Sequence, residues 1–148
     1  MVPSKRFKPV LRIAESRERT AAHRFGDSQR KVQEQEAKLD ELRRYHQEYL
    51  DRFNAASRNG MSAAQLREYQ AFLAKLDQAI QEQENIVHAS DADCTVSKKE
   101  WQNKHIRSKV LDNVMSRCEM EERRHKDKLE QKEVDERSQS SVFRRPSR

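Results

Sequence analysis

The sequence is poor in the residues that turn a chain or fill a globular core. It has two glycines, three prolines, two cysteines and 6% aromatic residues in a length of 148. Hydrophobic residues make up 34% and charged residues 38%, and the mean hydropathy is −1.20. Because several packed layers need both turns and apolar side chains, this composition excludes a compact globule. Disorder and long helices remain, and they differ in whether the apolar residues recur periodically.

Signals for secretion, membrane insertion and catalysis are also missing. The N-terminal Met-Val-Pro-Ser-Lys-Arg lacks the apolar segment of a signal peptide, and no run of about 18 apolar residues could span a bilayer. The five histidines are scattered, and HExxH, CxxC and glycine-rich phosphate loops are absent. Cys94 and Cys118 are on one predicted helix, about 36 Å apart, so they cannot bond within a chain. We expect a cytoplasmic protein with reduced cysteines that is not an enzyme, with no catalytic residue, metal site or cofactor.

The residues that are present follow a seven-residue repeat with steps of four and three. In the N-terminal part the repeat is interrupted at Glu18 and otherwise consists of Phe7, Leu11, Ala14, Ala21, Phe25, Ser28, Val32, Gln35, Leu39, Leu42, His46, Tyr49 and Phe53. A second run consists of Leu66, Tyr69, Leu73, Leu76, Ile80, Gln83, Val87, Ser90, Cys94, Ser97, Trp101, Lys104, Ser108, Leu111, Met115, Cys118, Glu122, His125 and Leu129. Such runs are typical of the contact seam of coiled-coil helices.

A turn separates the two runs. Asn59 and Gly60 can adopt the left-handed conformation that ends a helix, and Ser62 with Gln65 has the spacing of a capping box. A turn this short makes the two helices antiparallel. The predicted fold is therefore all-α, a long antiparallel two-helix coiled-coil hairpin. We predict a single domain over 1–148, with helix 1 at about 5–57, a turn at 58–61, helix 2 at about 62–137 and a disordered basic tail at 138–148.

Antiparallel pairing in which residue numbers sum to about 122 brings the two seams together. It places Phe53 by Tyr69 and small Ala21 opposite bulky Trp101. Helix 2 then extends past the start of helix 1. Residues 119–137 are predicted to lack a partner within the chain and to gain order from another protein.

The positive charge is concentrated at the two ends of the sequence. Residues 1–12 carry +4 and residues 138–148 carry +3 of the net +6, so the other 125 residues sum to −1. Both basic ends fall at the end of the predicted hairpin away from the turn. They suit an acidic or phosphate-rich partner there, and the alternative, that they only keep the protein soluble, stays open.

A second feature is a set of apolar residues beside the seam near the turn. These are Tyr45, Leu50, Phe72, Ala79 and Ile86. They either thicken the contact between the helices or form a docking face for a partner protein, since exposed aromatic side chains are common interface anchors.

Several of these residues resemble the FliJ family of the flagellar type III export apparatus, over roughly residues 10–137. The similarity is in Tyr45-His-Gln-Glu-Tyr49, Asn59-Gly60, Tyr69-Gln-Ala-Phe72, Leu76, Ala79-Ile80, and Trp101 with Lys104. It implies a fold similar to the central-stalk hairpin of rotary ATPases. It also implies binding to the flagellar export ATPase and to the cytoplasmic domain of the export-gate membrane protein, and escort of export chaperones. The expected location is cytoplasmic and peripheral at the inner-membrane export apparatus, through these partners.

The resemblance further implies two sets of site residues. An export-gate docking face is expected at Leu42, Tyr45, Tyr49, Phe72, Leu76 and Ala79, with two further positions at which this sequence departs in residue type, Lys38 and Gln83. An ATPase-ring end is expected at Lys5, Arg6, Lys8, Arg12, Arg123 and Arg124. The chain is then expected to enter the ATPase ring and raise its hydrolysis rate without catalysing a reaction itself.

Two other functions are compatible with a basic coiled coil. A nucleic-acid-binding helix concentrates lysine and arginine in one stretch, whereas acids interleave with them here, so no nucleic-acid partner is expected. A purely structural coiled-coil spacer is the second alternative, and it would leave the apolar residues beside the seam without a purpose.

Overall fold

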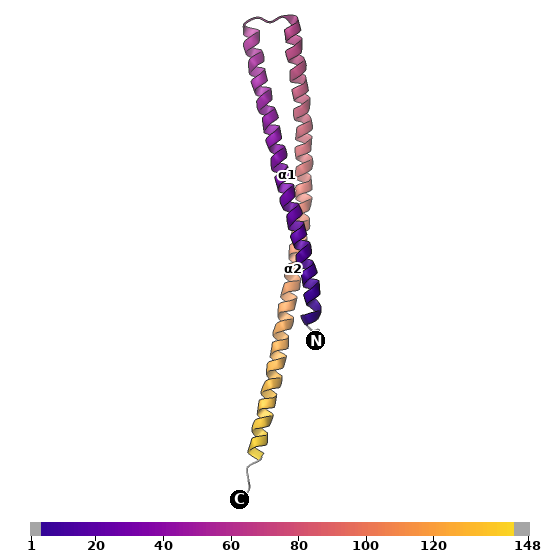
Figure 1. Cartoon of the computed structure of the whole chain (residues 1–148), viewed down its shortest axis with the longest axis vertical. Coiled ribbons are helices and arrows are strands. Elements are labelled where there is room, and N and C mark those ends of the chain that lie inside the picture. The colour runs from indigo at the N-terminus through magenta and orange to yellow at the C-terminus, as the bar shows by residue number, and fades with distance from the viewer. Residues whose placement is uncertain (1–3, 144–148) are drawn as a thin grey trace. The chain divides into compact units, whose positions relative to one another are not determined.

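The computed structural model describes residues 4–143. These residues form two helices, α1 (Ser4–Arg58) and α2 (Ala63–Phe143), and no strand (Figure 1). The helices pack against each other in antiparallel directions, which confirms the predicted all-α helical hairpin.

The turn between α1 and α2 depends on one glycine. Gly60 has a φ of +91°, which a residue without a Cβ reaches at no steric cost, and its N–H donates to the Ser57 carbonyl at 3.4 Å. No other described residue has a positive φ, so Asn59 does not share this role. The predicted capping box is confirmed: the backbone N–H of Ser62 donates to Gln65 Oε1 and the N–H of Gln65 donates to Ser62 Oγ, both at 3.2 Å.

The C-terminal boundary of α2 lies beyond the predicted one. α2 continues to Phe143, so residues 138–143 of the predicted disordered tail are helical. This stretch contains neither glycine nor proline, and the Ser141 hydroxyl donates back to the Ser138 carbonyl at 2.8 Å, a bond compatible with the helix. The rest of the predicted tail, 144–148, lies outside the described residues.

The described residues divide into two compact units. The turn unit comprises residues 20–102, and the terminal unit comprises residues 4–19 and 103–143. Each contains a part of α1 and a part of α2. The single domain predicted from the sequence stays a prediction, and the two units are described separately below.

In the turn unit, the predicted seam residues fill the contact between the helices. Ala21, Leu39, Leu76 and Val87 are buried, and the ring centroids of Phe53 and Tyr69 are 5.6 Å apart. Leu66 is the exception, with 38% exposure, because it lies in the first turn of α2 at the end of the helix pair.

A polar layer interrupts this seam. The Gln83 amide donates to the Gln35 backbone carbonyl at 3.0 Å and to its side-chain carbonyl at 2.8 Å, and the Ser28 and Ser97 hydroxyls are 3.0 Å apart. The residue numbers of cross-helix partners sum to values on both sides of the predicted 122. The sum is 118 for Gln35 with Gln83 and 127 for the Arg43–Glu84 ion pair. The ring of Trp101 lies beside that of Phe25, with centroids 6.0 Å apart, and the predicted pairing of Trp101 with Ala21 stays a prediction.

In the terminal unit, the seam combines polar contacts with apolar ones. Ala14 and Ser108 are buried, and His105 Nδ1 lies 2.5 Å from Glu18 Oε1. At the start of α1 the Ser4 backbone N–H and hydroxyl donate to the Glu122 carboxylate at 2.7 and 2.9 Å. From residue 123 to 142 every side chain is exposed, including the predicted seam residues His125 and Leu129, because α1 has no residues left to pair with them.

Candidate docking surfaces

Five aromatic residues near the turn form one connected cluster on both helices, namely Tyr45, Tyr49, Phe53, Tyr69 and Phe72. Tyr49 of α1 lies between Phe72 and Tyr69 of α2, with ring centroids 4.3 and 5.3 Å apart. Tyr45 contacts Phe72 edge-on at 6.1 Å and is 46% exposed. The Tyr49 pairs are tilted and the Tyr45–Phe72 pair is edge-on, and such arrangements bury aromatic surface between the helices. The cluster therefore holds Tyr45 in place while leaving nearly half of its surface open to a partner.

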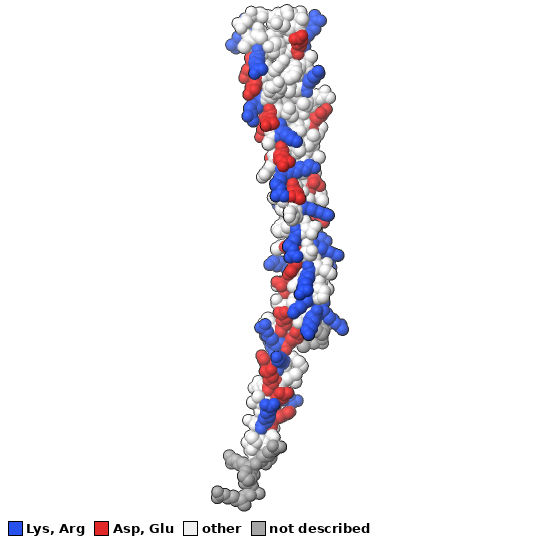
Figure 2. Space-filling model, in the orientation of Figure 1, with Lys and Arg blue, Asp and Glu red and all other residues white. Residues whose placement is uncertain are grey.

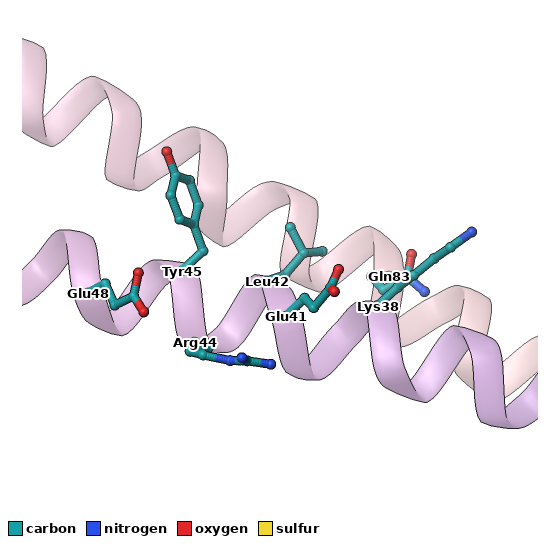
Figure 3. A pocket seen from close by; sticks show the side chains of 7 residues that line it. All are labelled: Lys38, Glu41, Leu42, Arg44, Tyr45, Glu48 and Gln83. Carbon is teal, nitrogen blue, oxygen red and sulfur yellow. The ribbon is translucent and has the colours of Figure 1, made fainter.

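A groove lies beside this cluster, and we call it the turn-unit groove. It has a volume of about 570 Å³ and is lined by Lys38, Glu41, Leu42, Arg44, Tyr45, Glu48 and Gln83 (Figure 3). Six of these residues belong to α1, and Gln83 belongs to α2. In Figure 3 the side chains of Tyr45 and Leu42 extend from α1 towards α2. Two cations and two carboxylates surround an apolar floor, so the groove has mixed charge.

The opposite flank of the turn unit carries polar contacts between the helices. Arg43 forms an ion pair with Glu84 at 3.2 Å, and His46 Nε2 lies 2.9 Å from Asp77. In the heptad pattern Arg43, Asp77 and Glu84 fall on the side of the seam opposite to Tyr45 and Phe72, and His46 contacts Asp77 from the seam itself. One flank is thus polar and paired, whereas the other is aromatic and partly open. Figure 2 shows uncharged surface over much of the visible face next to the turn.

The residues expected in the export-gate docking face differ in how far they are accessible. Lys38 and Tyr45 are exposed, whereas Leu76 and Gln83 are only 7% and 8% exposed and lie between the helices. The other four are half-buried: Leu42, Tyr49, Phe72 and Ala79. The structure brings Lys38, Leu42, Tyr45 and Gln83 to one groove. Leu76 and Gln83 are therefore the least accessible of the eight residues, although Gln83 lines the groove.

The residues expected at the ATPase-ring end all belong to the terminal unit. Lys5, Arg6, Lys8 and Arg12 are exposed on α1, and Arg123 and Arg124 are exposed on α2. Figure 2 shows basic side chains gathered over the N-terminal part of α1. The Ser4 contact with Glu122 brings the start of α1 next to Arg123, since both Ser4 and Arg123 line one shallow depression.

Two carboxylates of the terminal unit have lowered pKa values. Hydrogen bonds from the Ser4 backbone N–H and hydroxyl lower the pKa of Glu122, and the charges of Lys5 and Lys8 act in the same direction. The pKa of Glu18 is lowered mainly by its hydrogen bond with His105, although partial burial opposes this. Both carboxylates therefore favour the charged form and tie α1 to α2.

A comparison with known proteins identifies the family. The profile described as Flagellar FliJ protein matches residues 4–147. The chain belongs to the FliJ family. The flagellar FliJ proteins of Salmonella typhi and of Escherichia coli (strain K12) are each 25% identical to it over 134 residues, which cover 90% of this chain and 91% of theirs. No solved structure matches the chain.

Two features are absent from the described part of this FliJ-family chain. Within residues 4–143, no group of three or more His, Cys, Asp or Glu side chains is placed to hold a metal ion. In the same residues, neither helix has a stretch long and apolar enough to cross a bilayer.

Sequence reasoning missed one surface of this FliJ-family chain. A groove in the terminal unit, which we call the terminal groove, has a volume of about 210 Å³ and is lined by Val10, Ile13, Ala14, Arg17, Lys104, Arg107 and Leu111. Val10 and Ile13 lie just outside the heptad seam, and their three-residue spacing puts them on one face of α1. This spacing is the feature of the sequence from which the groove could have been predicted.

Proposed function

We propose that this FliJ-family chain is a cytoplasmic component of the flagellar type III export apparatus that acts by binding, peripheral to the inner membrane. In this proposal the turn unit contacts the cytoplasmic domain of the export-gate membrane protein. The terminal unit binds the export ATPase ring and stimulates it, and the chain escorts export chaperones. The observation that carries the proposal is the half-exposed Tyr45 held by the aromatic cluster beside the turn-unit groove.

The aromatic cluster supports the gate contact. Tyr45 is not needed to fill the space between the helices, because Tyr49 and Phe72 already pack against each other there. An aromatic side chain fixed by its neighbours loses little conformational entropy when a partner covers it, and buried aromatic anchors supply much of the binding energy in protein interfaces.

The terminal unit supports the ATPase contact. Its α2 segment over residues 123–142 is helical and exposed on all sides, so its side chains are free to contact surrounding subunits of a ring. A helix pair that binds the assembled ring better than free subunits shifts the equilibrium towards the ring. Such a chain raises ATPase turnover although it contributes no catalytic group.

The gate contact is tested with Tyr45→Ala in the full chain. We expect the affinity for the purified cytoplasmic domain of the export gate to fall by about tenfold, which corresponds to roughly 1.4 kcal/mol. Val96→Ala is the matched control, because Val96 is 64% exposed in the same unit and lines no part of the groove. An unchanged affinity in Tyr45→Ala, with unchanged helicity, would exclude this face as the gate contact.

The ATPase contact is tested by adding the wild-type chain to the cognate export ATPase. We expect faster ATP hydrolysis and a larger fraction of hexameric ring by analytical ultracentrifugation. If neither turnover nor oligomeric state changes, the chain is not an activator. Co-purification of export chaperones with the wild-type chain tests the escort role, and a chain that retains no chaperone does not perform it.

A further inference from the structure

The terminal groove combines an apolar floor with apolar edges. Ala14 is buried and Leu111 is half-buried at its floor, whereas Val10 and Ile13 at its edge are 43% and 54% exposed. Val110, one residue before Leu111, is 53% exposed. Solvated aliphatic side chains clustered at a concavity gain free energy when a partner covers them, at about 25 cal/mol per Å² of apolar surface removed from water.

The charged residues that line the terminal groove all have the same sign. Three of its lining residues are cationic, namely Arg17, Lys104 and Arg107, and none is acidic. Within residues 4–143 none of the three forms an ion pair. Two carboxylates of the same unit are engaged elsewhere, since Glu18 bonds to His105 and Glu122 bonds to Ser4. Glu15 and Asp112 adjoin the groove in sequence but do not line it. A ligand with negative charge in the groove would therefore meet three cations that form no ion pair.

The size and shape of the groove limit what can occupy it. Sites for drug-sized ligands are about 300–1,000 Å³, so a groove of about 210 Å³ accepts one or two protruding side chains rather than a whole small molecule. A flat bilayer would not fill a concavity, and the exposed residues are aliphatic, without the Trp and Phe typical of membrane-surface helices. A second copy of the same basic surface would be repelled.

We propose that the terminal groove binds an acidic amphipathic helix of a partner protein, which inserts one or two aliphatic side chains beside Val10, Ile13 and Leu111. The partner's Asp and Glu residues, one helical turn before and after, pair with Arg17, Lys104 and Arg107. This inference rests on the proposed function in assigning that helix to the export ATPase. It places an ATPase contact at a surface different from the basic residues Lys5, Arg6, Lys8, Arg12, Arg123 and Arg124.

The inference is tested by measuring the dissociation constant between the full chain and the cognate export ATPase. Ile13→Glu puts a carboxylate at the apolar edge, and Arg107→Glu reverses one of the charges. We expect each to weaken binding by at least about tenfold, and the wild-type affinity to fall steeply with added salt. Ile106→Glu and Arg19→Glu are matched controls, because both residues are exposed in the same unit and neither lines the groove. We expect both controls to bind like the wild type.

The possible outcomes separate the inference from the proposed function. If the wild-type chain does not bind the ATPase, the ATPase part of the proposed function fails, and the occupant named here fails with it. If the wild type binds while Ile13→Glu and Arg107→Glu bind equally well, only the groove is excluded. Retained helicity of the exposed Arg107→Glu variant shows that its loss of binding is not unfolding. Binding to phosphatidylglycerol vesicles that is lost in both groove variants, with ATPase binding unchanged, would overturn the inference in favour of a membrane surface.

Discussion

Gln83 is a seam residue with a polar side chain, and it is 8% exposed. Its amide donates twice to Gln35 of α1, at 3.0 and 2.8 Å. A buried polar pair in a coiled coil fixes the register of the helices, since any shifted alignment leaves both amides without partners, and it does so at a cost in stability. The pair thus helps to position Tyr45 and Phe72 opposite each other.

Substitutions of Gln35 and Gln83 show whether this pair stabilises the hairpin or lowers its stability. Gln83→Ala leaves the Gln35 side chain unpaired, and we expect it to lower the free energy of unfolding by about 1–3 kcal/mol. The double variant Gln35→Leu with Gln83→Leu should be more stable than the wild type, because aliphatic packing replaces the polar layer. Urea unfolding followed by circular dichroism measures both. A double variant as unstable as the single one would show that the polar pair itself stabilises the hairpin.

Glu18 should make the stability of the terminal unit sensitive to acid. Its pKa is lowered from 4.5 in the folded chain, chiefly by the hydrogen bond with His105. A carboxyl with a lowered folded pKa stabilises the fold above its unfolded pKa, and this contribution is lost as the pH falls through the folded value. We therefore expect the free energy of unfolding to decrease as the pH drops below about 4.5.

Glu18→Gln provides the comparison for this acid sensitivity. The amide does not titrate, so the variant should be less stable than the wild type at neutral pH and should lose less stability on acidification. Urea titrations at a series of pH values measure the difference. Parallel pH profiles for the two proteins would show that the Glu18 pKa is not shifted in the folded chain.

The heptad pattern predicted which residues lie between the helices but not which of them a partner can reach. The family resemblance selected Leu76 and Gln83 for the docking face, yet both occupy seam positions, and their burial follows from the same repeat. The terminal groove was missed for a different reason. Its seven residues come from both helices, and their proximity depends on the register of the helix pair, which the predicted residue-number sum of about 122 fixed only approximately.

At the scale of the element, the start of α2 and the end of α1 are determined by different residues. Ser62 and Gln65 satisfy each other's backbone N–H groups, each at 3.2 Å, whereas α1 stops where Gly60 adopts its positive φ. The sequence predicted both features because each depends on residues within a few positions. The end of α2 was predicted less well, since 138–143 contains no residue that terminates a helix.

The capping box gives a prediction for the start of α2. Ser62→Ala removes the side-chain acceptor for the Gln65 N–H, and we expect it to lower the free energy of unfolding by about 1 kcal/mol. Ser62→Gly should cost only a few tenths of a kcal/mol, because glycine leaves the helix N-terminus accessible to water. Thermal unfolding by circular dichroism checks the order of the three proteins. Equal melting temperatures for Ser62→Ala and the wild type would mean that the box contributes nothing in solution.

At the scale of the molecule, the two candidate surfaces belong to different compact units. Tyr45 and the turn-unit groove lie in residues 20–102, whereas the terminal groove lies in residues 4–19 and 103–143. The sequence predicted the hairpin but not this division, because the heptad repeat continues without interruption past residue 102 in α2. A continuous seam contains no signal for a boundary between units.

The separation of the surfaces predicts independent binding. We expect Tyr45→Ala to weaken the export-gate contact without changing ATPase affinity, and Arg107→Glu to do the reverse. In the double variant, the loss of binding free energy for each partner should equal that of the corresponding single variant to within about 0.5 kcal/mol, as for sites that share no partners. Titrations of the wild type, the two single variants and the double variant against each partner give this double-mutant cycle. A coupling energy well above that value would show that the two surfaces communicate through the helices.

The short turn also determines how the two helices find each other. Four residues, 59–62, are all that join α1 to α2, and these residues lie at the surface. A short linker of this kind keeps its two ends at an effective concentration on the order of millimolar. A chain cut at Gly60 would replace one intramolecular step with the association of two peptides, and its stability would then depend on protein concentration. The FliJ-family hairpin could therefore be used as a split pair, reassembled from α1 and α2 expressed separately.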